Sequence, residues 1–323
     1  MVRGLEFLGR HATVVLALGV FLGIVAQPLA AVFRPFLMPA VWALLAFSMM
    51  RLDRRAFQAV LRKPSRLALV VAWMLVVTPV LMWLLVDAIG ADDGLRAALI
   101  LTAASVPLMS TPAIGLILGL DGALVMAVLV TTSMLIPFTL PVAALSLIGL
   151  DLGTTALDLM LSLGALLGTS ALAAVIGRGV VGGHRIDARG HLLDGAAVLM
   201  LLVFAVALMD GITTRLFAEP VRMLLLTALS FAVYIGLMIA GGAVFAVLWR
   251  DRAAAMSAGL ASGCRNMAII IVVLPSDADP EIMTYFALAQ FPIYIMPSLM
   301  RPVIGRALRN AAPRSISFGG GST

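Results

Sequence analysis

The heptapeptide Ala261-Ser-Gly-Cys-Arg-Asn-Met267 lies in the middle of an apolar run from Ala253 to Leu274. Such a run is long enough to cross a bilayer, because about 20 apolar residues suffice. An arginine at the bilayer centre costs about 3 kcal/mol on insertion scales, so we do not expect Arg265 to face lipid. Its guanidinium should face the protein interior or a wet cavity. There it is either part of a functional site or a structural cation, bound to a carboxylate or to the free carbonyls of a broken helix.

The composition of the whole chain agrees with a membrane protein. Of its 323 residues, 62% are hydrophobic and 12% are charged, and the mean hydropathy is +1.12. Long apolar runs alternate with short polar breaks, which is typical of an all-α, polytopic membrane protein. The one cysteine excludes an internal disulfide and a cysteine metal cluster, and three scattered histidines argue against a histidine metal site. No metal site is therefore predicted.

The apolar runs predict ten transmembrane spans. Of the Lys and Arg residues, 17 fall on one side of these spans and four on the other, with Arg265 inside the membrane. The positive-inside rule then places both termini in the cytoplasm and the protein in the inner (plasma) membrane. This distribution explains the net charge of +6 without a nucleic-acid partner. The predicted spans are 11–32, 35–50, 67–88, 95–119, 122–148, 153–177, 192–209, 221–249, 253–274 and 281–300.

Ten spans divide into two repeats of five, at about residues 11–148 and 153–300. An odd-numbered repeat must be inverted relative to its twin. The fourth span contains Pro107 and Pro112, and its counterpart, the ninth, contains Ser262-Gly263 at the same depth. Interrupted spans at matching places indicate a transporter site between crossing, broken helices. The alternative is that the prolines only kink packed helices.

The predicted domain organisation is one transmembrane transporter unit, residues 1–310, followed by a disordered cytoplasmic tail, residues 311–323. No nucleotide-binding motif, nucleophile elbow or His-Glu-x-x-His pair is present, so an enzyme is not expected. The expected partners are the lipid bilayer and a small organic anion. The sequence leaves a monomer and a homodimer equally open.

Several of these features resemble the bile acid:sodium symporter family, in the bile acid–arsenite–riboflavin transporter superfamily. They are the ten spans, the broken fourth and ninth spans, and the pattern Gly263-x-x-Asn266. The resemblance extends from the first span to Arg309 and is that of a divergent member. It implies a panel domain beside a core domain, with the crossing of the broken helices in the core and the substrate cavity next to it.

The departures from the family pattern concern sodium. Family members coordinate two sodium ions near the crossing, partly through a glutamate and a glutamine that correspond here to Ala261 and Arg265. A guanidinium in place of these ligands adds repulsion on the order of a few kcal/mol. We therefore predict that sodium binds weakly or not at all, and that Arg265 holds the crossing together or meets the carboxylate of the substrate. The other family ligands correspond to Thr111, Pro112, Val125, Leu129 and Met74.

The function expected from the sequence is secondary transport of a small organic anion, driven by a proton or by no ion, without a cofactor. Two alternatives stay open. One is an arsenite- or oxyanion-type efflux carrier of the same fold, with Cys264 as a soft ligand. The other is a membrane sensor that binds its ligand without translocating it. The predicted substrate-binding residues are Ser110, Thr111, Pro112, Ser262, Cys264, Arg265 and Asn266.

Overall fold

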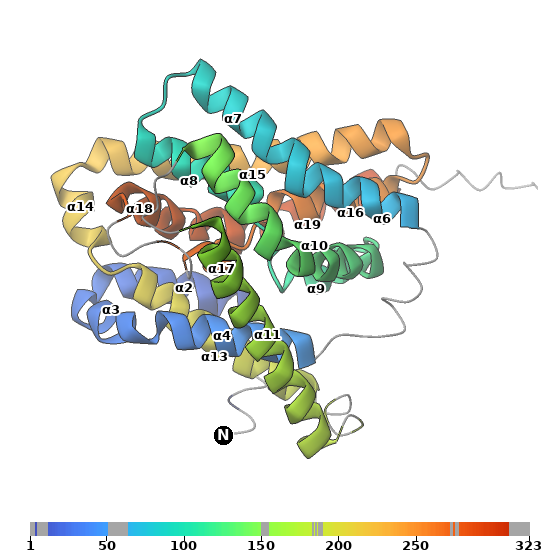
Figure 1. Cartoon of the computed structure of the whole chain (residues 1–323), viewed down its shortest axis with the longest axis horizontal. Helices are drawn as coiled ribbons and strands as arrows, with labels where there is room; N and C mark the ends of the chain where they lie inside the picture. Colours follow the sequence, from blue (N-terminus) through green and yellow to red (C-terminus); the bar gives the residue numbers. More distant parts are fainter. Residues whose placement is uncertain are drawn as a thin grey trace, which may run out of the picture.

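A computed structural model describes residues 12–50, 64–149, 155–182, 190–271 and 278–309, and the single residues 4, 184, 186 and 274. The described chain is all-helical (Figure 1). The first part contains α2 (Ala12–Val25), α3 (Gln27–Phe33), α4 (Leu37–Met50), α6 (Pro64–Ala72), α7 (Thr78–Ala88), α8 (Asp93–Ala104), α9 (Thr111–Ile117) and α10 (Gly122–Ala143). The second contains α11 (Ala156–Val181), α13 (Gly190–Leu208), α14 (Ile212–Ala218), α15 (Pro220–Leu248), α16 (Arg252–Gly263), α17 (Ala268–Ile271), α18 (Pro280–Leu288) and α19 (Gln290–Arg309). The predicted tail, residues 311–323, lies outside the described residues.

Several described helices are long and apolar enough to cross a membrane. Five meet this condition alone, and up to seven do so if each of two bent helix pairs counts as one span. The five are Gln27–Met50, Pro64–Ala88, Gly122–Ile148, Ala156–Val181 and Pro220–Leu248. The bent pairs are Leu192–Leu208 with Ile212–Ala218, at 40°, and Pro280–Pro297 with Leu299–Arg306, at 44°. The structure thus has the helices of a membrane protein.

The first two predicted spans meet differently from the prediction. The sequence places a boundary at residues 33–34, but the chain is helical from Gln27 to Met50, with a 3₁₀ turn over Arg34–Phe36. Pro35 is tolerated there because the first turn of a helix needs no N–H donor from it. The real break lies at Ala26, whose φ and ψ are −107° and 66°.

Four helices that frame the broken spans begin with an aspartate cap. Each carboxylate accepts a hydrogen bond from a main-chain N–H in the first turn, which satisfies a donor that the helix leaves free. The caps are Asp92 before α8, Asp121 before α10, Asp251 before α16 and Asp279 before α18. The sequence therefore fixes where both broken spans and the helices after them begin.

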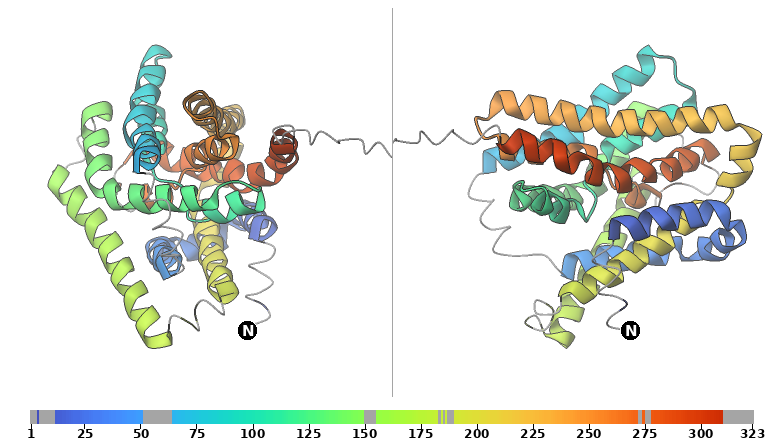
Figure 2. Two further views of the ribbon diagram at one scale, coloured as in Figure 1. Left: turned by 90° about the vertical axis from the view of Figure 1, so that its right-hand side faces the viewer. Right: turned by 180° about the vertical axis from the view of Figure 1, so that it is seen from behind.

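The helices pack in two groups. One, which we call the side bundle, consists of α2, α3, α4, α11 and α13, with α13 packed along α2, α3 and α4. The other, the crossing bundle, consists of α6 to α10 and α15 to α19. Figures 1 and 2 show α2, α3, α4 and α13 below α6, α7, α15 and α16. The bundles meet where α10 packs on α11 and α19 packs on α2.

The closest helix pair in the crossing bundle is α15 with α16. Small residues make this approach possible, as in other membrane helix pairs. A Cβ at Gly259 would lie 2.7 Å from the Met238 carbonyl oxygen, and one at Gly263 would lie 2.8 Å from that of Tyr234. The end of α16 is thereby pressed against α15, immediately before the chain leaves the helix.

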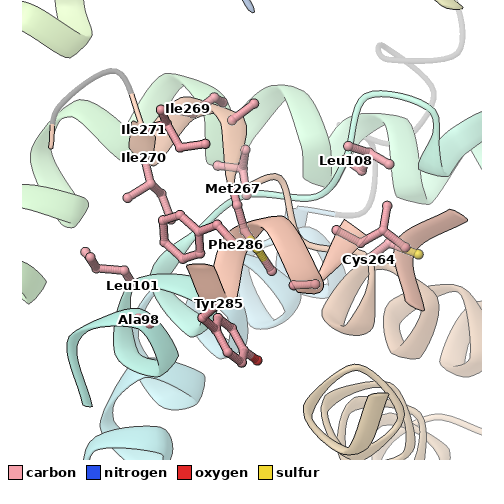
Figure 3. Close-up of a cluster of buried hydrophobic side chains, with 14 of the residues drawn as sticks. Ala98, Leu101, Leu108, Cys264, Met267, Ile269, Ile270, Ile271, Tyr285 and Phe286 are labelled. Atoms are coloured by element: carbon pink, nitrogen blue, oxygen red, sulfur yellow. The ribbon is translucent and has the colours of Figure 1, made fainter. Parts of the chain in front are cut away.

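A continuous apolar core surrounds the ends of the broken helices. Figure 3 shows part of it, with Cys264 and Leu108 at one end of the cluster and Phe286 beside Met267 near its middle. Its buried side chains come from α8, α17 and α18 and from both breaks. The extended segments are therefore enclosed by protein, which is where irregular backbone at membrane depth persists.

Candidate functional site

The candidate site is the crossing of the two interrupted spans. The chain leaves α8 after Ala104 and re-enters a helix at Thr111, and it leaves α16 after Gly263 and re-enters at Ala268. The two extended segments pair as an antiparallel bridge between Pro107 and Arg265. Their shared apolar surroundings contain no solvent to replace a missing main-chain partner.

Two main-chain hydrogen bonds hold the crossing. The Leu108 N–H donates to the Cys264 carbonyl oxygen over 2.8 Å, and the Asn266 N–H donates to that of Val106 over 2.8 Å. These bonds satisfy groups that the helix breaks would otherwise leave buried and unpaired, at a cost of about 1–3 kcal/mol each. The predicted broken helices thus meet in space and join through their backbones.

The Arg265 side chain fills the space beside this bridge and is 1% exposed. Its Nε donates to the Ser262 carbonyl oxygen over 2.8 Å, and its Nη1 donates to that of Ser105 over 2.6 Å. Nη1 also lies 3.5 Å from the Met74 carbonyl oxygen, a weak contact, and Nη2 donates to Thr78 Oγ1 over 2.9 Å. We call these four oxygens the arginine cage.

The cage uses four of the five N–H groups of a guanidinium. Sequence reasoning left two roles open for Arg265, holding the crossing together or meeting the substrate. The bonds favour the first role, because most donors are already engaged within the protein.

Helix ends supply the negative charge that faces the guanidinium. Ser105 caps the C-terminus of α8, and Ser262 lies in the last turn of α16. Each helix C-terminus carries about half a negative charge from its free carbonyls. Within the described residues no ion pair involves Arg265. Two helix ends, rather than a carboxylate, therefore partly neutralise the buried cation.

Thr78 is a site residue that the sequence analysis missed. Its hydroxyl oxygen lies 2.9 Å from the Met74 carbonyl oxygen and 3.0 Å from that of Ala103, and it accepts from Arg265. A π-helical turn over Trp73–Val77 precedes it, next to Pro79, which has no N–H to give an α-helical bond. A signal existed, since Thr78 is the only hydroxyl side chain in the predicted span 67–88.

A second missed residue, Trp73, fixes the end of α16. Its Nε1 donates to Ser262 Oγ over 3.1 Å, and Ser262 Oγ donates to the Ala258 carbonyl oxygen over 2.8 Å. Trp73 also packs edge-on against Phe245 of α15, with ring centroids 6.2 Å apart. The Ser262 carbonyl is thus held in place for the Nε of Arg265.

The thiol of Cys264 lies on the other side of the crossing. The Tyr234 hydroxyl is 2.8 Å from its Sγ, and the Thr111 side chain lies close to it. Thr111 is fully buried, yet within the described structure its hydroxyl has no hydrogen bond of normal geometry. Of the polar groups at the crossing, the Thr111 hydroxyl is therefore the one left with bonding capacity.

The remaining predicted site residues have plainer roles. The side-chain oxygen of Asn266 accepts from the Ala268 N–H over 3.2 Å, which turns the chain into α17. Pro112 is buried in the first turn of α9, and Ser110, just before it, is half-buried. Val125 and Leu129, at positions where the family has hydroxyl ligands, are buried apolar side chains of α10.

The described structure shows no cluster of three or more His, Cys, Asp and Glu residues that could hold a metal ion. No protein-family model matches the sequence, and no curated protein matches it significantly. The geometry of the crossing and the arginine cage therefore carry the functional argument.

Proposed function

We propose that this chain is a secondary carrier with ten transmembrane spans in two inverted repeats, a divergent relative of the bile acid:sodium symporters. The observation that carries the proposal is the main-chain bridge between two broken helices beside the buried Arg265. Broken helices that meet at mid-membrane are the usual place of a substrate site in carriers built from repeats. The side bundle and the crossing bundle would then be the panel and core domains.

The spacing of the aspartate caps supports an internal repeat. Asp92 lies 13 residues before Ser105, where α8 ends, and Asp251 lies 13 residues before Cys264, where α16 ends. The caps of the following helices, Asp121 and Asp279, are 158 residues apart. This agreement is what two copies of one helical unit would produce.

The bridge follows the same register. Pro107 and Arg265 are 158 residues apart, so a shift of 158 exchanges the two bridge residues with each other. The same shift exchanges the bond from Leu108 to Cys264 with the bond from Asn266 to Val106. A two-fold axis that relates inverted repeats would pass through such a bridge.

A small organic anion is the substrate class that this electrostatic arrangement favours. The arginine cage leaves a buried positive charge that only helix dipoles and neutral oxygens face among the described residues. Thr111, with its unused hydroxyl, is the side chain that we expect to contact the substrate. Because the guanidinium already fills the cage, we propose that transport does not require sodium. The proposed orientation in the inner membrane, with both termini cytoplasmic, follows from the Lys and Arg distribution.

The test is uptake into proteoliposomes that contain the purified protein. Radiolabelled pyruvate, benzoate and taurocholate are the probes, each with a sodium gradient and with choline in its place. We expect saturable, sodium-independent uptake of at least one probe. Thr111→Val should lower that uptake about five-fold, the equivalent of one hydrogen bond, while Thr111→Ser keeps it. Uptake no higher than in protein-free liposomes for all three anions would overturn the proposal.

The same vesicles test the arsenite alternative. Arsenite has affinity for thiols, and Cys264 is the only thiol in the chain. We expect no arsenite uptake above that of protein-free liposomes. Arsenite uptake that Cys264→Ser abolishes would replace the organic anion with a metalloid substrate in the same fold.

A further inference from the structure

Two helices of the crossing bundle begin with the same three-residue pattern. α6 begins Pro64-Ser-Arg66, and α15 begins Pro220-Val-Arg222. Proline suits the first turn of a helix, where its missing N–H is not needed. The arginine two positions later projects from the same turn in both helices.

Each of these arginines pairs with the aspartate that caps a broken span of the other repeat. Arg66 Nη1 lies 3.3 Å from Asp251, the cap of α16. Arg222 Nη2 lies 2.6 Å from Asp92, the cap of α8. We call these pairs the α6–α16 clamp and the α15–α8 clamp. Exchange of the two proposed repeats converts one clamp into the other.

The clamps lie at opposite ends of the crossing bundle. In Figure 1 the first turn of α6 is on the right side of the molecule, whereas α8 begins on the left, where α14 leads into α15. Each clamp therefore fastens the start of one broken helix, and the bridge between Pro107 and Arg265 lies between them.

The two clamps are not equal in charge. Arg222 also binds Glu281 in the first turn of α18, through Nε to Oε1 over 3.2 Å and through a second contact from Nη2 to Oε2. Glu281 follows the cap Asp279 by two residues, and the matching position after Asp121 is Ala123. The α15–α8 clamp thus holds two carboxylates and joins three helices.

The α6–α16 clamp has a different second partner. The Arg66 guanidinium carbon lies 5.3 Å from the centre of the Trp249 ring, a cation–π distance. Its Asp251 side chain is 47% exposed, while the Glu281 side chain in the other clamp is 15% exposed. Solvent and salt screen the more exposed pair more strongly.

We propose that the fold carries two symmetry-related ion-pair clamps of unequal strength, and that the weaker one makes the first turn of α16 the end of the crossing that opens more readily. The α15–α8 clamp keeps α8, α15 and α18 together as α16 opens. The assignment of the opening end to the cytoplasmic side rests on the proposed function and its orientation. The inequality of the clamps does not depend on that orientation.

Hydrogen–deuterium exchange of the full-length protein in lipid nanodiscs tests the inequality. Exchange of helix amides reports local opening. After correction for intrinsic rates, we expect the first two turns of α16 to exchange about two- to five-fold faster than those of α8, the range for one extra exposed ion pair. Equal protection of the two helix starts, or better protection of α16, would overturn the proposal.

Variants separate the clamps from the helix caps. Asn caps a helix as well as Asp does, so Asp92→Asn and Asp251→Asn remove the ion pairs and keep the caps. We expect each to raise exchange at its own helix, with Arg222→Gln and Arg66→Gln giving the same pattern. Glu281→Gln should bring α8 close to α16. If Glu281→Gln leaves the difference between α8 and α16 unchanged, the second carboxylate is not its cause and the proposal fails. Absent uptake with unequal protection would overturn the carrier proposal alone.

Discussion

Arg265 donates through Nη1 to the carbonyl oxygen of Ser105, a residue 160 positions earlier in the chain, over 2.6 Å. Through Nε the same guanidinium binds Ser262 at the end of α16. One side chain therefore caps the C-termini of both broken helices at once. Because free carbonyls at helix ends attract a cation, this contact neutralises two helix ends that the crossing brings together.

Removal of the guanidinium should destabilise the fold. Arg265→Met keeps a long side chain but leaves the Ser105 and Ser262 carbonyls without this donor. A buried unsatisfied acceptor costs about 1–3 kcal/mol, so we expect a loss on the order of 3 kcal/mol in the free energy of unfolding. Thermal unfolding in detergent measures this loss. Arg265→Lys, which keeps the charge but has fewer donors, should fall between the two. An unchanged melting temperature for Arg265→Met would show that the cage does not stabilise the crossing.

Sodium should not stabilise the wild-type protein. A ligand that binds only the folded state raises its stability by RT ln(1 + [L]/Kd), about 2.7 kcal/mol at 100 times Kd. We expect equal melting temperatures in sodium chloride and choline chloride, because Arg265 already occupies the cage. In Arg265→Ala the cage oxygens are free, and sodium should then raise the melting temperature. A sodium-dependent rise in the wild type would reveal a cation site that does not depend on Arg265.

Thr78 should matter through its hydroxyl rather than its shape. Thr78→Val is nearly isosteric and removes the acceptor for Nη2 of Arg265. A hydrogen bond to a charged group contributes about 1.5–3 kcal/mol, and we expect the free energy of unfolding to fall by that amount. Thr78→Ser keeps the hydroxyl and is the control. Equal melting temperatures of the Val and Ser variants would show that the hydroxyl contributes nothing beyond packing.

The contact between α15 and α16 should tolerate no Cβ at Gly259. An added methyl group would lie 2.7 Å from the Met238 carbonyl oxygen, so Gly259→Ala must separate the helices. Overpacking of this kind costs about 1–3 kcal/mol. Gly236→Ala in α15 is the matched control, because no atom lies within 4 Å of its added Cβ. That control should be neutral or stabilising by up to about 1 kcal/mol. Melting temperatures of the two variants decide the point, and similar values for both would contradict a tight helix contact.

The sequence predicted the features that follow from the cost of polar groups in an apolar run. The burial of Arg265 and the interruption of both broken spans are confirmed, since each follows from chemistry local to that span. The partners of the arginine were not predicted. Thr78 and Trp73 belong to another span, and only packing brings them to α16. The break at Ala26 was also missed, because neither proline nor glycine marks it; Gln27 bonds the surrounding carbonyls instead.

The hydrogen bonds at the bridge join peptide groups, and peptide groups are the same whatever side chains they carry. Val106, Leu108 and Cys264 contribute only backbone atoms to these bonds. Mutation can therefore alter the side chains around the bridge while the path of the chain stays the same. In evolutionary terms, a lineage could exchange one solute for another, or a free ion for a tethered one, without having to invent a new architecture.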